Sequence, residues 1–130
     1  MPYQQGRRWL HELDEQVGSG EGVNPLLRSL APSLGRCHFI KTRSETTRRA
    51  TQLVSNLRAW EQQHGEYPDS LDVFADRDCA YDPFGDGYFA YRRVDGGFKL
   101  YSVGGDGSDD AGVHDRKGEV NDLLFWPRPE

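Results

Sequence analysis

An apolar stripe of helical spacing, stopped by a glycine and a proline, restricts the fold of this sequence more than any other feature. Five apolar residues recur at intervals of three and four: Ala50, Leu53, Val54, Leu57 and Trp60. This spacing puts them on one face of an α-helix. Residues 42–45 match a capping box, although the helix can begin earlier. Gly65 is suited to end the helix, and Pro68 forbids its continuation. The sequence therefore predicts a helix of about 20 residues that must bury this stripe.

A shorter amphipathic helix is predicted near the N-terminus, within residues 4–17. Its apolar residues also have helical spacing: Trp9, Leu10, Leu13 and Val17. The run Gly18–Gly22 would end this helix and serve as a flexible linker. Asn24–Pro25 suits a cap and a first helical position. The helix that follows is expected to be short, because Pro32 and Gly35 interrupt it.

The second half of the chain is rich in aromatic residues and glycine, which favours strands and loops. Strands are predicted over residues 88–93 and 98–103, with the hairpin signal Asp95–Gly97 between them. A third short strand is predicted at 123–126, after a long acidic loop. The order of elements predicts an α+β fold, in which a long amphipathic helix packs on a small antiparallel β-sheet.

Composition excludes collagen, coiled-coil and wholly disordered proteins. The chain has 130 residues and a net charge of −5, a mean hydropathy of −0.81, no apolar run near the ~20 residues of a membrane helix and no visible signal peptide. Cys37 and Cys79 are too far apart for a CxxC pattern, and they form either one disulfide or two buried thiols. The four histidines lack ligand spacing. The neighbours Cys37 and His38 would point apart on a helix, and no catalytic constellation is present, so we expect no enzyme.

Six short motifs occur in an order that resembles a known family. They are Leu57–Glu61, His64–Pro68, Asp82–Gly85, Phe98–Gly104, Asp106–Gly107 and Asn121–Leu123. The motifs describe four features in this order along the chain: a helix ending in a G-x-Y-P turn, a D-P-aromatic-G corner, a hairpin ending in Y-S-x-G and an acidic loop. In the order and spacing of these motifs, residues 42–126 are similar to the soluble domain of the major pseudopilin of bacterial type II secretion systems. The resemblance implies a non-enzymatic structural protein with protein partners or self-assembly, and no small-molecule substrate.

The resemblance also implies one calcium ion in the loop between the hairpin and the last strand. Residue by residue, it implies three ligands: Asp106, Asp122 and the carbonyl of Val103. Asp109 and Asp110 are further candidates within the loop, and Asp110 is preferred because it is farther from the Asp106 turn. The chemistry of the loop supports a hard cation independently. Calcium takes six to eight oxygen ligands, and carboxylates that converge without a cation would repel each other. The alternative is a solvated acidic loop whose aspartates cap turns.

The family's cleavage site and membrane helix are not found in this sequence. Residues 1–35 have no counterpart in the family, so we divide the chain into a helical appendage with linker, 1–35, and a pseudopilin-like domain, 36–130. We expect the chain to be a fragment of a longer protein, which would meet a membrane only through an upstream segment. By the resemblance alone, the domain would be extracytoplasmic, at the periplasmic face of the inner membrane.

A basic stretch gives the second hypothesis. Residues 36–58 hold six basic residues and one acid, a net charge of +5, whereas the chain as a whole is acidic. Such a helix could bind nucleic acid or another acidic polymer. No aromatic residues lie among the arginines to stack on bases, so a solvated helix face is the simpler interpretation and no nucleic acid is expected.

Overall fold

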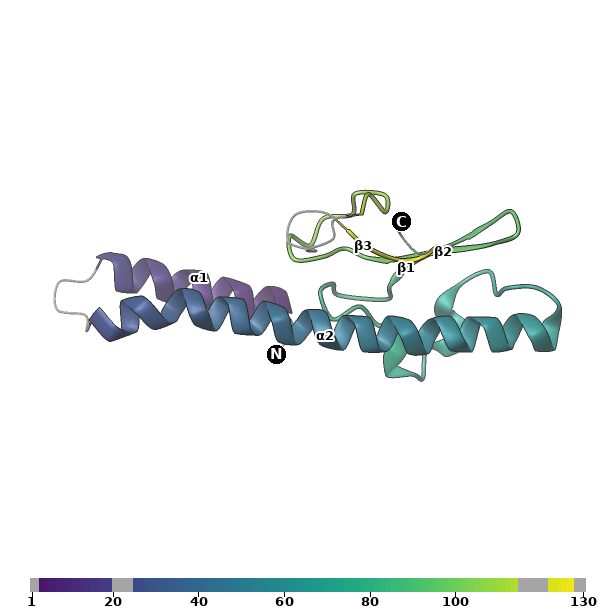
Figure 1. Ribbon diagram of the computed structural model, residues 1–130, viewed down its shortest axis with the longest axis horizontal. Coiled ribbons are helices and arrows are strands. Elements are labelled where there is room, and N and C mark those ends of the chain that lie inside the picture. Colours follow the sequence, from purple (N-terminus) through teal and green to yellow (C-terminus); the bar gives the residue numbers. More distant parts are fainter. Residues whose placement is uncertain (1–2, 20–24, 115–121, 128–130) are drawn as a thin grey trace.

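The protein is an elongated α+β structure built along one helix (Figure 1). The computed structural model describes residues 3–19, 25–114 and 122–127. The helices and strands are α1 (Tyr3–Ser19), α2 (Pro25–His64), β1 (Ala90–Val94), β2 (Gly97–Ser102) and β3 (Leu123–Trp126). Helix α1 runs beside the N-terminal part of α2, and the sheet lies over the remainder of α2. The predicted α+β class, with helices and a small antiparallel sheet, is confirmed.

Helix α2 is one uninterrupted helix of 40 residues, and the predicted break near Pro32 is wrong. A proline inside a helix removes one backbone hydrogen bond and costs about 3 kcal/mol. Pro32 itself lies on the surface of the helix. Packing of α1 along this part of α2 offsets the cost. The helix also continues without a break through residues 35 and 36, where the predicted division between appendage and domain falls.

The C-terminal end of α2 follows the predicted stop signals. Gly65 takes a left-handed conformation, with φ of 80°, and its N–H donates to the Glu61 carbonyl at 2.7 Å. A short 3-10 helix, Leu71–Phe74, follows after the Ser70 side chain caps its first turn. A second 3-10 helix, Asp78–Ala80, then leads the chain back along α2 toward the sheet.

The sheet is a three-stranded antiparallel meander in the order β1-β2-β3. Gly96, with φ of 78°, makes the turn between β1 and β2, and Val94 pairs with Gly97. Strand β2 buries alternate residues. The predicted third strand, 123–126, matches β3, and the first two predicted strands overlap β1 and β2. Strand β3 is an edge strand, and a bulge at Leu100/Tyr101 shifts its register against β2.

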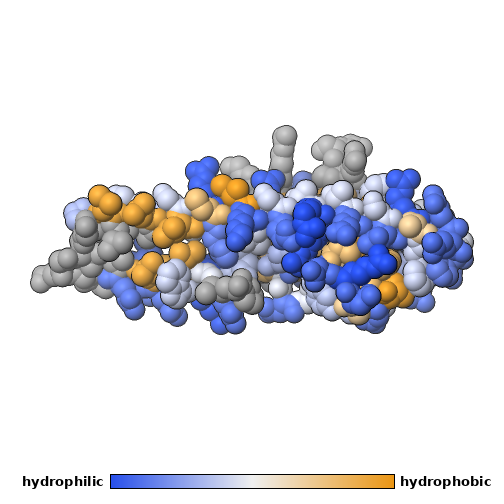
Figure 2. Space-filling view, turned by 90° about the horizontal axis from the view of Figure 1, so that it is seen from below, coloured by the Kyte–Doolittle hydropathy of each residue, from blue (hydrophilic) through white to orange (hydrophobic). Residues whose placement is uncertain are grey.

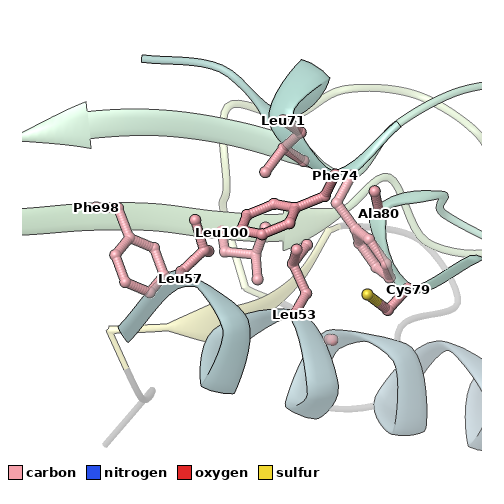
Figure 3. Packing of buried hydrophobic residues seen from close by; sticks show 10 residues of the cluster. Leu53, Leu57, Leu71, Phe74, Cys79, Ala80, Phe98 and Leu100 are labelled. Atoms are coloured by element: carbon pink, nitrogen blue, oxygen red, sulfur yellow. The ribbon is translucent and has the colours of Figure 1, made fainter. Parts of the chain in front are cut away.

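The core lies between the α2 stripe and the inner face of the sheet (Figure 3). Three stripe residues are fully buried, namely Ala50, Leu53 and Leu57, whereas Val54 and Trp60 pack at its edge. Phe98 and Leu100 of β2 close the core from the sheet side, and the two 3-10 helices supply further buried side chains. None of the helices in the described residues is both long and apolar enough to cross a membrane.

Candidate functional site

The acidic loop leaves β2 through a series of tight turns. Left-handed backbone occurs at Gly104, Gly107 and Gly112, with φ between 72° and 77°, and also at Ala111, with φ of 58°. Glycine has no penalty there, whereas an alanine in this conformation costs about 1–2 kcal/mol. The strained Ala111 is held by its carbonyl, which accepts a 2.7 Å hydrogen bond from Lys99 Nζ. The described part of the loop, up to residue 114, is therefore tightly folded.

Asp122 and Asp110 are brought together beneath these turns. The Asp122 side chain is fully buried, and its Oδ2 accepts hydrogen bonds from the backbone N–H groups of Asp110 at 3.0 Å and Gly112 at 2.7 Å. Its Oδ1 is buried without a hydrogen-bond partner, and so is Oδ2 of Asp110. Burial raises the pKa of Asp122, the nearby charges of Asp109 and Asp110 raise it further, and the two N–H donors oppose the shift.

Of the other three predicted ligands, Asp106 and Asp109 accept hydrogen bonds that fold the loop. Asp109 Oδ1 accepts hydrogen bonds from the Tyr101 hydroxyl and from Ala111 N–H, both at 2.9 Å. Asp106 Oδ1 accepts from Ser108 N–H at 3.0 Å, which is an Asx turn. Val103 donates its N–H to Asp82 Oδ2, a contact that does not involve the carbonyl predicted as the ligand. The structure therefore joins Asp110 with Asp122 and leaves Asp106 and Asp109 capping turns.

The carboxylate oxygens of Asp110 and Asp122 are ligands that a hard cation prefers, but they are few. Two buried carboxylate oxygens without partners are a costly arrangement, which is relieved by a proton or by a cation. Within residues 3–19, 25–114 and 122–127, no group of three or more His, Cys, Asp or Glu side chains gathers closely enough to hold a metal. From the described part of the loop, a calcium ion would take backbone carbonyl or water oxygens beside Asp110 and Asp122. The predicted loop residues 115–121 lie outside the described residues.

Asp82 is a buried residue whose full role the sequence did not reveal. As expected, it opens the Asp82–Gly85 corner, since Phe84 N–H donates to its Oδ1 at 3.0 Å. The same carboxylate also accepts the Ser102 hydroxyl at 2.8 Å and Val103 N–H at 3.1 Å, at the end of β2. Burial raises the pKa of Asp82, against these donors and Arg49. Asp82 therefore fastens the corner to the strand from which the acidic loop departs.

Helix α1 also contacts this junction. Gln4 Nε2 donates to the Phe84 carbonyl at 3.1 Å, and Arg7 Nη1 donates to the Gly105 carbonyl at 2.7 Å. The Tyr3 ring packs edge-to-face on Phe84, with ring centroids 4.7 Å apart. Gly107 lies against Gln4 so closely that an added Cβ would be 2.6 Å from its amide nitrogen. Sequence periodicity could place α1 as a helix but could not reveal these contacts.

Part of the positive charge on the basic face of α2 is neutralised by an acidic residue of the same helix. Glu45 accepts hydrogen bonds from Arg48 at 2.7 and 3.0 Å and from Arg49 at 2.8 Å. These two arginines lower the pKa of Glu45 to about 2. Arg49 also donates to the Tyr81 carbonyl at 3.3 Å, which ties it to the 3-10 segment. The polymer-binding hypothesis therefore depends on the remaining basic residues of 36–58 and stays a prediction.

The junction also holds a cleft of about 340 Å³ between α1, α2 and the corner. Its lining mixes charges of both signs, including Lys41, Glu45 and Arg49.

The neighbours Cys37 and His38 point in different directions, since the Cys37 thiol is exposed and the His38 ring stacks on Tyr3. Both cysteines are free thiols, and only Cys79 is buried. The two alternatives predicted for the cysteines, a disulfide and two buried thiols, are therefore both wrong.

Comparison with family models, with curated proteins and with solved structures finds no match for this chain.

Proposed function

We propose that this chain is a non-enzymatic structural or assembly domain of the pseudopilin-like type, whose acidic loop is stabilised by one calcium ion. The order of motifs along residues 42–126 supports the pseudopilin-like part. One observation carries the calcium part: Asp122 Oδ1 and Asp110 Oδ2 are buried without partners in one loop. We also propose, from the resemblance alone, that the domain works outside the cytoplasm with protein partners.

The arrangement of Asp122 explains how an ion would act. Its Oδ2 already holds the backbone of residues 110–112, so its Oδ1 is fixed in position before any ion arrives. An ion between Asp122 and Asp110 would remove the repulsion of two buried carboxylates and tie the loop to the start of β3. At a free concentration a hundredfold above the dissociation constant, binding adds about 2.7 kcal/mol of stability.

A thermal melt with calcium, with magnesium and with excess EDTA tests the proposal. The 2.7 kcal/mol converts to a rise in Tm of roughly 10 °C for a chain of this size. Magnesium should give a smaller rise, because it demands octahedral geometry and keeps its waters. Equal melting temperatures in calcium and EDTA would contradict the calcium site and would favour a protonated Asp122.

Asp122→Asn gives a sharper test than deletion of the side chain. The amide oxygen can still accept from Asp110 and Gly112, so the fold of the loop is kept, while the buried charge is gone. We expect the variant to melt at or above the parent in EDTA and to lose the rise with calcium. The matched control is Asp95→Asn, which removes one exposed charge from the β1–β2 turn and should keep the full response. A full response in Asp122→Asn would exclude Asp122 as a ligand.

A further inference from the structure

The helical hairpin of α1 and α2 exposes large apolar side chains on its surface. They are, with their exposed fractions, Leu26 (67%), Leu30 (46%), Leu34 (49%), Ile40 (53%) and, on α1, Trp9 (53%). We call these five residues the hairpin stripe. Leu26, Leu30 and Leu34 follow at intervals of four, so they share one face of α2. Seen from below, away from the sheet, hydrophobic residues gather over the hairpin (Figure 2).

Trp9 lies on the side of α1 that faces away from the acidic loop. Arg7 reaches the Gly105 carbonyl on the side of the acidic loop. Residues two apart on a helix project about 200° apart, so Trp9 points away from that side. The stripe as a whole leaves on the order of 400 Å² of apolar surface exposed, the scale at which patches on monomers tend to be functional.

Charges along the hairpin are segregated in a way that specifies its partner. We call the end where α1 ends and α2 begins the tip, and the opposite end of the hairpin the root. In α1 the acids Glu12, Asp14 and Glu15 lie toward the tip, whereas Arg8 lies toward the root. On α2, Arg36 and Lys41 also lie toward the root, whereas Arg28 is a base toward the tip, where the acids still outnumber it. Two hairpins packed antiparallel would therefore set each acidic tip beside a basic root, while parallel packing would bring like charges together.

We infer that the hairpin stripe is an interface for a second copy of this chain, packed antiparallel about a two-fold axis. Such an interface is isologous, so the same leucines of both copies form it. An acidic tip of one copy then lies beside a basic root of the other at both ends of the contact. With on the order of 400 Å² from each copy, the contact is smaller than the roughly 1,200–2,000 Å² of stable specific interfaces, so the dimer should be weak and reversible. The inference does not depend on the calcium site.

Sedimentation velocity over about a hundredfold range of concentration tests the inference. The parent should change from monomer to dimer, and Leu30→Glu or Leu34→Glu should weaken the dimer at least about tenfold, since each buries a charge at the centre of the contact. The matched control is Val94→Glu, a similarly exposed apolar residue at the β1–β2 turn, at the opposite end of the molecule (Figure 1). Circular dichroism confirms that each variant is folded.

A charge exchange tests the antiparallel arrangement. At low salt, Arg8→Glu and Glu15→Arg should each weaken the dimer several-fold, and the double variant should restore it, because both members of each pair are reversed. The differences should shrink at high salt. Single reversals without effect at low salt would overturn the antiparallel arrangement.

Three other outcomes would overturn the inference. They are a monomer at every concentration, a dimer that Leu30→Glu leaves intact, and a monomer that binds phosphatidylcholine/phosphatidylglycerol vesicles through the stripe. The last would assign the hairpin stripe to a lipid surface.

Discussion

Replacing Asp82 should reveal how strongly one carboxylate holds the corner to the sheet. Asp82→Ala removes the acceptor for three donors, of which Phe84 N–H is buried and Val103 N–H is partly buried. A buried donor without a partner costs about 1–3 kcal/mol, and the Ser102 hydroxyl can rotate, so its loss is smaller. Removing the buried charge itself returns part of this cost. We expect a net loss of about 3 kcal/mol.

Urea denaturation followed by circular dichroism measures this loss as a fall in the midpoint of roughly 1.5 M at unchanged slope. Asp82→Asn keeps one oxygen for Phe84 and Ser102 but turns an NH₂ toward Val103 N–H, so it should cost about 1–2 kcal/mol. Asp86→Ala removes an exposed carboxylate from the same turn and should have almost no effect. The reasoning is wrong if Asp82→Ala lies within about 0.5 kcal/mol of the parent, or if Asn costs as much as Ala.

Three further changes test other parts of the fold. Because Arg48 and Arg49 lower the pKa of Glu45 from 4.5 to about 2, its contribution is present above pH 4.5 and is lost as the pH falls toward 2. On this exposed site the contribution is about 0.5–1 kcal/mol, so Glu45→Gln and the parent should differ at pH 7 and converge near pH 2 by urea denaturation. Gly35→Ala should raise stability by about 1 kcal/mol, because its Cβ would meet nothing within 4 Å in a helix. Gly65→Ala should instead lower stability by about 1 kcal/mol, because φ is 80° there; equal effects of both alanines in thermal melts would contradict this account.

The sequence determined local features of the fold well and its long-range contacts poorly. The stop at Gly65, the turn at Gly96 and the third strand were predictable because each depends on the conformational preferences of a few adjacent residues. The length of α2 was not, because the penalty of Pro32 is offset by α1, which packs alongside. A local rule cannot include that tertiary contribution.

The candidate site shows the same division. The acidic loop, its glycines and the importance of Asp122 were expected from the residues and the resemblance. Asp110 was also preferred over Asp109, but the contact that holds Asp109, a hydrogen bond from the Tyr101 hydroxyl of β2, could not be predicted from the sequence. The tertiary role of Asp82 was missed for a similar reason, since Ser102 lies 20 positions further along the chain.

The contacts of α1 with the corner and the loop carry a consequence for the order of folding. The Gln4–Phe84 and Arg7–Gly105 hydrogen bonds join residues 80 and 98 positions apart. Closing such long loops is entropically slow, whereas α1 and α2 are neighbours in sequence and can pair early. The hairpin and the sheet should therefore form first, and docking of α1 onto Phe84 and Gly105 should come last. Arg7→Ala would then speed unfolding and leave the refolding rate almost unchanged, so this docking sets how long the native state persists.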